Sequence, residues 1–270
     1  MKVRNLFEFL GFKSKPQHYP YELVEFDLND LGIVRYAQWK HPSESSKVIT
    51  SELVDQYRTY VKEGDFCIDV GAHTGDTSLP IGLAAGQEGC VLALEPNPYV
   101  YHVLEKNARA NAHLANVIPM MAAAGKENGF MEFEYSDSGF CNGGRHENIS
   151  FLDHGHAYKQ EVFSVDLEQE LRSDFQAFLP KLSFLKVDAE GFDLYVLLSL
   201  KEIISEFRPV IKAEVFKRTG TKYREDLMGF FEKLDYAVHK IKSDPVEKGE
   251  ELKKEDLLPG THYDVLALPN

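Results

Sequence analysis

Short apolar runs alternate with amphipathic segments of helical length from Phe66 to the end of the chain. Segments with apolar residues at helical spacing predict helices at 76–86, 98–112, 193–206 and 222–233. Apolar runs predict strands at 66–70, 90–95, 117–121, 182–188, 210–215, 236–241 and 263–268. Strands separated by helix-length segments are typical of parallel β-α-β units, and the almost continuously apolar first strands indicate helices on both sheet faces.

The first part of the chain departs from this alternation. We expect residues 1–46 to form an N-terminal extension that docks on the main domain, 47–270, with short strands at 22–27 and 32–38. A helix is predicted at 47–62. Leu6, Phe7, Phe9 and Leu10 fit a short amphipathic helix that docks on the body of the protein or, alternatively, touches a membrane surface.

A second departure lies between two strand-like runs, FMEFEYS and QEVFSVD. The segment 136–160 between them is predicted to be a variable loop, and a loop of this length in a compact domain is usually functional or disordered. Its histidines, His146, His154 and His156, either bind substrate or metal or are simply solvated. The charged stretch 244–258 is expected to be a solvated loop or surface helix.

Composition narrows the classes of function. The net charge of −13 disfavours broad binding to a nucleic-acid backbone, which needs clustered Lys and Arg. No apolar run reaches the roughly 20 residues of a membrane span. The cysteines, Cys67, Cys90 and Cys141, are odd in number and widely spaced, so we expect neither a disulfide framework nor a zinc site. A cytoplasmic location is predicted. No metal-binding residues are assigned, and whether a divalent metal is needed stays open.

The stretch FCIDVGAHTG, residues 66–75, places an acid and two glycines where the first regular strand meets its helix. Ligands of open parallel sheets bind beyond the carboxyl ends of the strands. Gly71 would permit an unusual backbone conformation, and Gly75 would let a ligand approach the helix N-terminus. The alternative is a tight turn in which glycine serves geometry alone.

A second acid, Glu95, ends the next strand in LALEPNP. An acid at this place is positioned to accept hydrogen bonds from ribose hydroxyls, although it could also be a helix N-cap or a solvated acid. The dinucleotide fingerprint GxGxxG has its middle glycine where this chain has His73. This histidine favours a smaller ligand, S-adenosylmethionine, over a pyrophosphate-containing one.

Two further acids follow the strand in FLKVDAEGFDLYVLLSL, residues 184–200. Asp188 ends the strand, and Glu190 with Gly191 forms the turn into the next helix. Beside a methyl donor, these carboxylates could orient a substrate hydroxyl and accept its proton, or bind the ligand's amino group or a divalent metal. A strand-end acid followed by a helix-capping acid is the structural alternative.

Together, three stretches closely resemble FkbM-type methyltransferases of the class I S-adenosylmethionine-dependent group. They are IDVGAHTGDTS, ALEPNP followed by VLEKNARAN, and FLKVDAEGFDLYVL followed by RPVIKAEV. The resemblance covers about residues 48–240 and leaves residues 1–46 and the loop 136–160 outside it. The family more often has asparagine where this chain has His73.

The resemblance implies an α/β, Rossmann-like fold: a mostly parallel seven-stranded sheet with helices on both faces and an antiparallel C-terminal hairpin made of 236–241 and 263–268. It makes 47–270 a methyltransferase domain and implies O-methylation of a hydroxyl on a sugar or secondary metabolite. By the same resemblance, the methionine part of the cofactor is bound by Asp69, Gly71, His73 and Gly75, and the ribose by Glu95. The adenine is bordered by Asn97 and by Ala122–Ala124, with Ala123 at the centre of that segment. Asp188 and Glu190 face the reacting centre. Asp188 is thereby expected both in cofactor binding and in catalysis.

Glu190 or Asp188 is the expected base, with His73 as a further candidate. Two other readings stay open: an NAD-dependent Rossmann oxidoreductase, and a non-catalytic scaffold on a degenerate methyltransferase fold. The expected partner is a small-molecule or glycan acceptor with a free hydroxyl, whose identity the sequence does not reveal. The oligomeric state is also open.

Overall fold

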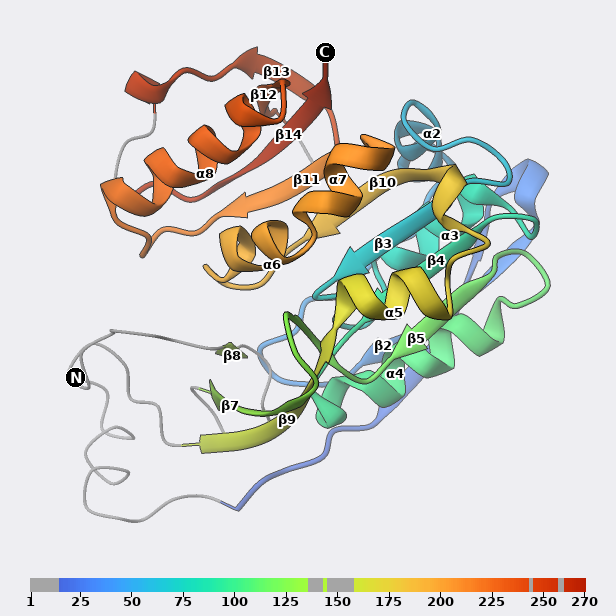
Figure 1. The fold of residues 1–270 in the computed structure, drawn as a ribbon. Coiled ribbons are helices and arrows are strands. Elements are labelled where there is room, and N and C mark those ends of the chain that lie inside the picture. The colour runs from blue at the N-terminus through green and yellow to red at the C-terminus, as the bar shows by residue number, and fades with distance from the viewer. Residues whose placement is uncertain (1–14, 136–142, 145–157, 243–244, 257–259) are drawn as a thin grey trace.

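The computed structural model describes residues 15–135, 143–144, 158–242, 245–256 and 260–270. Its centre is an eight-stranded sheet in the order β13-β12-β14-β11-β10-β3-β4-β5 (Figure 1). Strands β11, β10, β3, β4 and β5 run parallel to one another, whereas β14, β12 and β13 complete one edge with antiparallel pairings. The sheet strands are β3 (Phe66–Val70), β4 (Cys90–Leu94), β5 (Val117–Met120), β10 (Leu182–Val187), β11 (Val210–Val215), β12 (Tyr236–Ile241), β13 (Lys248–Glu251) and β14 (Tyr263–Pro269).

The mixed, mostly parallel α/β architecture agrees with the sequence prediction, but the strand count is eight rather than seven. The extra strand, β13, lies within the charged stretch 244–258 and pairs with β12 at the sheet edge. Charged side chains are common on edge strands, and they concealed this one. Because β13 lies between them in the chain, β12 and β14 pair antiparallel without forming a simple hairpin.

Helices cover both faces of the sheet. Apolar residues of α2 and α3 pack with Cys67, Val91 and Phe184 on one face, where α4 also lies. Apolar residues of α5, α6, α7 and α8 pack with Ile68, Leu92 and other strand residues on the opposite face. The helices are α2 (Ser51–Arg58), α3 (Ser78–Ala85), α4 (Pro98–Ala110), α5 (Leu167–Ser173), α6 (Asp193–Ser199), α7 (Lys201–Phe207) and α8 (Thr221–Lys233), with short 3-10 turns η1 (Asn29–Leu31), η2 (Leu179–Lys181) and η3 (Lys254–Asp256).

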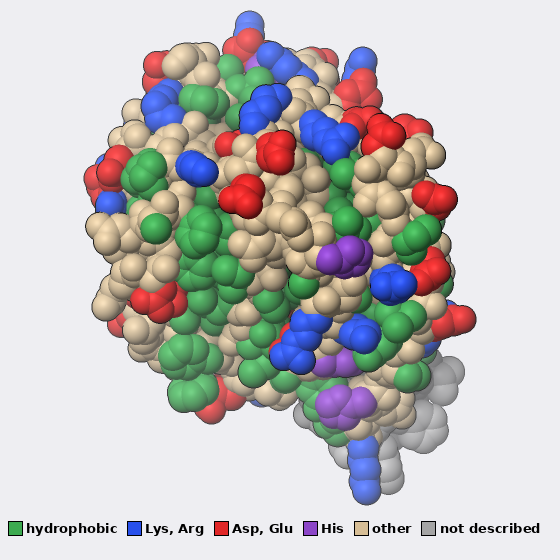
Figure 2. Space-filling model, turned by 90° about the vertical axis from the view of Figure 1, so that its right-hand side faces the viewer, with side chains coloured by type: hydrophobic (Ala, Val, Ile, Leu, Met, Phe, Trp, Pro, Cys, Tyr) green, Lys and Arg blue, Asp and Glu red, His purple; other side chains and the backbone are tan. Residues whose placement is uncertain are grey.

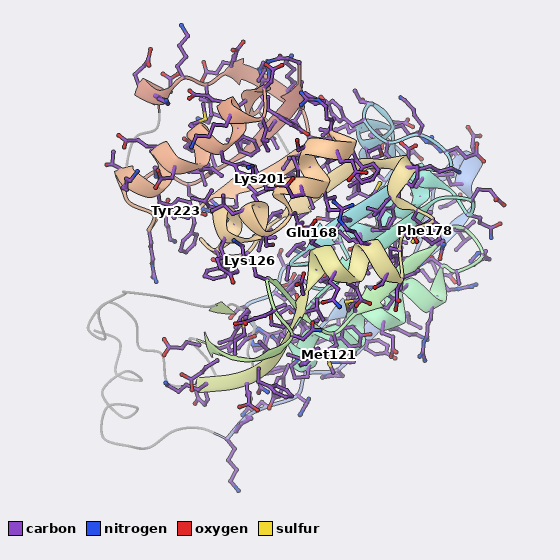
Figure 3. The ribbon with its side chains drawn as sticks, in the orientation of Figure 1. Met121, Lys126, Glu168, Phe178, Lys201 and Tyr223 are labelled. Carbon is purple, nitrogen blue, oxygen red and sulfur yellow. The ribbon has the colours of Figure 1, made fainter. Side chains whose placement is uncertain are left out.

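Local hydrogen bonds explain where several helices begin and end. The Thr50 side chain accepts a hydrogen bond from the Leu53 N–H at 3.2 Å, so α2 begins at Ser51, later than the expected residue 47. The single helix expected at 193–206 is two helices, because Leu200 leaves helical geometry between α6 and α7. The Tyr223 hydroxyl of α8 accepts a hydrogen bond from the Leu194 N–H at 3.0 Å and anchors the first turn of α6 (Figure 3).

A smaller sheet lies beyond the carboxyl ends of the central parallel strands, in the order β6-β9-β7-β8 (Figure 1). Its strands are β6 (Ala123–Gly125), β7 (Gly129–Tyr135), β8 (Gly143–Gly144) and β9 (Tyr158–Asp166). Strands β7 and β9 contain the two runs predicted on either side of the long loop, and they pair antiparallel. Most of the loop 136–160, including His146, His154, His156 and Cys141, lies outside the described residues.

The N-terminal strands β1 (Tyr21–Asp27) and β2 (Ile33–Trp39) form an antiparallel pair, which confirms both predicted strands. Strand β2 lies along α4, where the Asn107 side chain accepts a hydrogen bond from the Ala37 N–H at 2.6 Å. The Asn111 side chain accepts a second one from the Arg35 N–H at 2.9 Å. The predicted amphipathic helix at residues 6–10 lies outside the described residues, and the division at residue 46 stays a prediction.

Figure 2 shows acidic and basic side chains interspersed over one face of the molecule. Among the described residues, none of the helices is both long enough and apolar enough to cross a membrane.

Candidate active site

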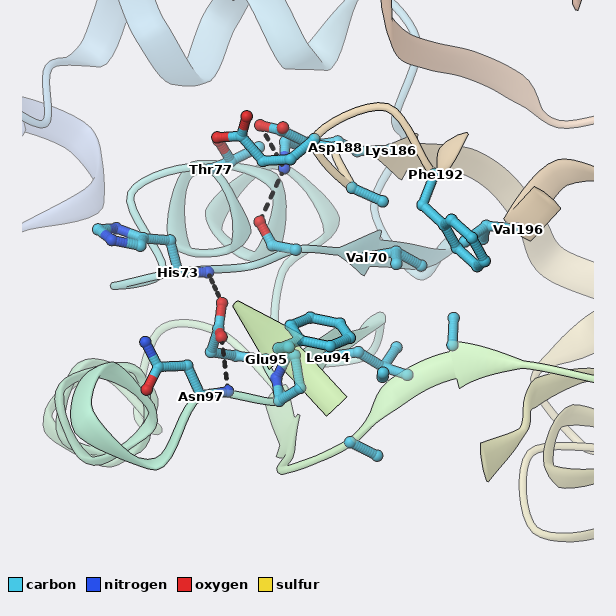
Figure 4. A pocket seen from close by; sticks show the side chains of 18 of the residues that line it. Val70, His73, Thr77, Leu94, Glu95, Asn97, Lys186, Asp188, Phe192 and Val196 are labelled. Carbon is cyan, nitrogen blue, oxygen red and sulfur yellow. Dashed lines mark hydrogen bonds and ion pairs between the residues drawn. The ribbon is translucent and has the colours of Figure 1, made fainter. Parts of the chain in front are cut away.

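A cavity of about 300 Å³ opens at the carboxyl ends of β3, β4 and β10, and residues of β7 in the small sheet also line it (Figure 4). One part of its wall is apolar, and the other part is rich in charged groups. The apolar part includes Val70, Leu94, Ala122, Ala123, Ala124, Met131, Phe133, Phe192 and Val196. The polar part includes Glu44, Lys47, His73, Asp76, Thr77, Glu95, Asn97, Lys186, Asp188 and Glu190.

The glycine turn after β3 owes its shape to close contacts within the protein. Gly71 has φ +80°, and a Cβ there would stand 2.0 Å from the carbonyl oxygen of Asp188. Gly75 has φ +86°, and a Cβ there would stand 2.9 Å from Leu104 Cδ1 of α4. Gly71 lines the cavity, but Gly75 does not. The contact with Leu104 gives Gly75 a packing role against α4, and its expected place beside the ligand stays a prediction.

Asp69 lies under this turn and does not line the cavity, contrary to its expected place beside the cofactor. Its fully buried carboxylate accepts a hydrogen bond from the Ser78 hydroxyl at 2.6 Å and one from Lys186 Nζ at 3.0 Å. Lys186 also donates to the Gly71 carbonyl oxygen at 3.0 Å. Asp69 thus ties β3, β10 and the start of α3 together through Ser78 and Lys186.

Lys186 is a site residue that sequence reasoning missed. Burial lowers the pKa of its ammonium group, but Asp69 and Asp188 more than offset this, so the pKa lies above its usual value. Lys186 Nζ is 3.5 Å from Asp188 Oδ2, and the cation therefore joins the carboxylate under the turn to the carboxylate at the cavity. A lysine inside the apolar run FLKVD was the available signal.

Glu95 fixes two backbone segments at the cavity. Its Oε2 accepts a hydrogen bond from the His73 N–H at 2.9 Å, and its Oε1 accepts one from the Asn97 N–H at 2.8 Å. Burial raises the pKa of Glu95, while His73, the two backbone hydrogen bonds and Lys186 oppose the rise. Asn97 itself is the N-cap of α4, since its side chain accepts from the Tyr99 N–H at 3.0 Å. A carboxylate has about four lone-pair positions, so Glu95 keeps acceptor capacity toward the cavity.

Asp188 and Glu190 meet at the turn after β10. The Asp188 N–H donates to the Val70 carbonyl oxygen at 3.0 Å, and its side chain is 46% exposed. Glu190 has φ +52°, an uncommon conformation for a residue with a Cβ. Burial and then the charge of Asp188 raise the pKa of Glu190.

The turn is held by Asp193, which accepts hydrogen bonds from the Gly191 and Glu214 N–H groups, both at 3.2 Å. The carboxylate of Asp193 thus joins this turn to β11, and the N-cap position of α6, Phe192, has no side-chain cap, so Glu190 is not the helix-capping acid of the structural alternative. Glu190 itself lines the cavity.

His73 lines the cavity with φ +49° and an edge-on contact to Trp39. Its Nε2 has no hydrogen-bond partner among the described residues and lies 3.9 Å from Glu44 Oε2. Glu44 and Asp76 each form an ion pair with Lys47 at 3.0 Å. Sequence reasoning missed all three residues. Glu44 and Lys47 lie before α2, and Asp76 follows Gly75 between β3 and α3, and no local pattern marks these charged residues as part of the site.

The structure brings together most of the predicted site residues: Gly71, His73, Glu95, Asn97, Ala123, Asp188 and Glu190 all line one cavity. Within the described part of the chain, no group of three or more His, Cys, Asp or Glu side chains is arranged to hold a metal ion. The loop histidines lie outside that part.

Comparison with known proteins identifies the family. A family model for the methyltransferase FkbM domain matches residues 69–238, from the glycine turn to β12. The chain belongs to the FkbM methyltransferase family. This membership confirms the resemblance read from the three sequence stretches, and the matched segment carries Glu95, Asp188 and Glu190.

Several solved methyltransferase structures are similar to this FkbM-family chain at low sequence identity. Methyltransferase FkbM from Methylobacillus flagellatus KT has 13% identity and a TM-score of 0.48, with 78% of this chain and 47% of that chain covered. TYW2 from M. jannaschii, in complex with AdoMet, has 16% identity and a TM-score of 0.45, with 94% and 87% covered. The present chain thus spans about half the length of the Methylobacillus protein. No curated protein matches the chain.

Proposed function

We propose that this FkbM-family protein transfers a methyl group from S-adenosylmethionine to a hydroxyl oxygen of a small-molecule or glycan acceptor. One observation carries the proposal: Glu95 after β4 and the pair Asp188 and Glu190 after β10 line the same cavity. Strands β4 and β10 lie on either side of β3 in the parallel part of the sheet, so these acids meet at the edge where ligands of such sheets bind.

The residues of the cavity fit an adenosyl ligand with a sulfonium group. The apolar wall at Leu94, Ala123 and Phe133 suits the adenine ring, and Glu95 offers acceptor positions to the ribose hydroxyls. The carboxylate of Asp188 suits the positive charge of the sulfonium. His73 Nε2, without a hydrogen-bond partner among the described residues, offers a polar contact to the methionine part.

When bound, S-adenosylmethionine supplies an electrophilic methyl group. The protein's own contribution is to align the acceptor oxygen with that methyl and to accept the hydroxyl proton. We assign the proton to Glu190, because a carboxylate with a raised pKa is the better base near neutral pH. Asp188 orients the hydroxyl, and Lys186 behind it holds Asp188 in place.

Methyl transfer can be tested with tritium-labelled S-adenosylmethionine and neutral acceptors such as methyl glycosides and myo-inositol. The expected product is a labelled methyl ether that resists mild base, formed by the wild type and not by a Glu190→Gln, Asp188→Asn double variant. Label that mild base releases would show transfer to a carboxylate and contradict O-methylation of a hydroxyl. Reduction of NAD by any of these alcohols would contradict the methyltransferase proposal itself.

A further inference from the structure

A buried carboxyl group lies next to the proposed reacting centre, outside the cavity lining described above. Glu214 is at the carboxyl end of β11, and Ala213 before it pairs with Val187 of β10. Asp188 and Glu214 are therefore neighbours on one sheet face, since side chains at matching register in parallel strands point the same way. On the other side, Glu214 pairs with Asp264 of β14.

Glu214 has one oxygen in use and one oxygen to spare. Its Oε1 is 3.5 Å from Nε2 of His262, the residue that precedes β14. Its Oε2 is buried and has no hydrogen-bond partner among the described residues. The residue is only 7% exposed, whereas the His262 side chain is 51% exposed. A buried polar atom without a partner is costly, so an incoming hydroxyl that pairs with it would bind favourably.

The backbone around this pair is held by one fully buried side chain, Arg224 of α8. Its guanidinium donates to the Phe216 carbonyl oxygen at 3.1 Å and to the Thr219 carbonyl oxygen at 3.2 Å, both after β11. It also donates to the Thr261 carbonyl oxygen at 2.6 Å, immediately before His262. The same cation thus fixes the two loops that position Glu214 and His262, as expected for a pre-organised binding site.

The charges around Glu214 determine its protonation. Burial, followed by the charges of Asp188, Asp193, Glu190 and Asp264, raises the pKa of Glu214 to about 10. Lys212 does not relieve this, because it pairs with Asp264 at 2.9 Å. Glu214 is therefore a neutral carboxyl group at pH 7, able to donate a hydrogen bond as well as accept one.

We propose that Glu214 and His262 form an acceptor subsite that binds a second hydroxyl group of a neutral, polyhydroxylated acceptor, beside the hydroxyl that reacts. The subsite rests on the proposed methyl transfer, because it is defined by its position next to Asp188 and Glu190, the proposed reacting centre. A polyol donates hydrogen bonds to the two carboxylates and accepts one from the neutral carboxyl. An anionic acceptor would be repelled by the carboxylates of Asp188 and Glu190, whereas a neutral polyol can pair with both carboxylates and with the neutral carboxyl.

Saturation-transfer NMR on the full chain with S-adenosylhomocysteine tests this subsite. The neutral probes are methyl α-D-glucopyranoside, methyl α-L-rhamnopyranoside and myo-inositol, and the charged comparator is glucuronate. At least one neutral probe should bind more tightly than glucuronate. Glu214→Gln keeps a neutral hydrogen-bond donor, so the Kd of the bound neutral probe should change by less than about threefold. Glu214→Leu and His262→Ala should each weaken binding of that probe about tenfold or more.

Matched controls are Glu202→Leu on the surface of α7 and His113→Ala, neither of which lies near the site; both should bind like the wild type. The subsite is overturned if no neutral probe binds, if Glu214→Leu binds normally, or if Glu214→Gln loses as much affinity as Glu214→Leu. Calorimetry with S-adenosylhomocysteine is run on each variant. Wild-type protein that fails to bind S-adenosylhomocysteine would overturn the proposed function, whereas normal binding with the wrong probe pattern overturns the subsite alone.

Discussion

Lys186 Nζ lies 3.0 Å from Asp69 Oδ1, and the two side chains are 5% and 0% exposed. This buried ion pair supports the turn that carries Gly71 and His73, and through Asp188 it reaches the proposed reacting centre. The pair therefore joins the stability of the fold to the geometry of the site.

Removing the cation should destabilise the protein strongly. Lys186→Met leaves the carboxylate of Asp69 buried without its charged partner, and such losses are about 3–5 kcal/mol. The Asp69→Asn, Lys186→Met double variant should lose less, since no charge is left unpaired. Urea unfolding measures both, with Lys201→Met on the exposed side of α7 (Figure 3) as the control, expected within about 0.5 kcal/mol of wild type. Equal losses for Lys186→Met and Lys201→Met would contradict the role of the pair.

Gly71→Ala should disrupt the junction between β3 and β10. The new Cβ would stand 2.0 Å from the Asp188 carbonyl oxygen at a φ of +80°, so the backbone of one strand end must move. We expect a loss of stability above about 2 kcal/mol and loss of cofactor affinity. Gly229→Ala in α8 is the matched control, because nothing lies within 4 Å of its Cβ position and alanine favours helix by about 0.5–1 kcal/mol. A Gly71→Ala protein that folds and binds like the wild type would rule out this explanation of the glycine.

The sequence predicted the positions of the acids more reliably than their partners. Asp69, Glu95 and Asp188 each lie within one residue of the carboxyl end of an apolar strand. The carboxyl ends of parallel strands share one edge, so periodicity alone places these acids near one another. The role of each acid depends on the side chains that pack around it. Asp69 faces Lys186 under the turn, whereas Glu95 and Asp188 face the cavity, and no local pattern distinguishes these environments.

Other parts of the site come from segments without local signals. Glu44 and Lys47 reach the cavity from a non-periodic segment before α2. Glu214 and His262 meet only because β11 and β14 pair antiparallel. Strand β13 was hidden by charged side chains, since an edge strand is defined by its backbone pairing. These contacts are tertiary, and sequence spacing does not encode them.

Glu190 should determine the acidic limb of the pH–rate profile. Its pKa is raised above the usual value of 4.5, so the reactive carboxylate forms, and kcat/KM rises, at a higher pH than for an ordinary glutamate. Glu190→Gln should lower kcat by about 10²–10⁴ and remove that limb, whereas Glu202→Gln on α7 should leave it unchanged. If Glu190→Gln keeps both its turnover and its acidic limb, another group is the base.

Glu214 should make the folded protein less stable as the pH rises. Its folded pKa, about 10, is above its unfolded value of 4.5, so its contribution is full below the unfolded pKa and is lost progressively up to the folded pKa. Glu214→Gln has no such proton to lose. Between about pH 6 and about pH 9, the wild type should therefore lose stability relative to Glu214→Gln. The free energy of unfolding of the variant minus that of the wild type should increase by up to about 1.4 kcal/mol per pH unit. Urea unfolding across this range checks the prediction, and a difference independent of pH would mean that Glu214 is ionised in the folded protein.

Calorimetric titration of the full chain with S-adenosylhomocysteine and with NAD tests the central claim most directly, because it needs no knowledge of the acceptor. We predict that S-adenosylhomocysteine binds and NAD does not. Glu95→Ala should weaken S-adenosylhomocysteine binding by about ten- to a hundredfold, while Glu88→Ala, before β4 and far from its carboxyl end, binds normally. Binding of NAD in place of S-adenosylhomocysteine, or of S-adenosylhomocysteine with undiminished affinity in Glu95→Ala, would contradict the account.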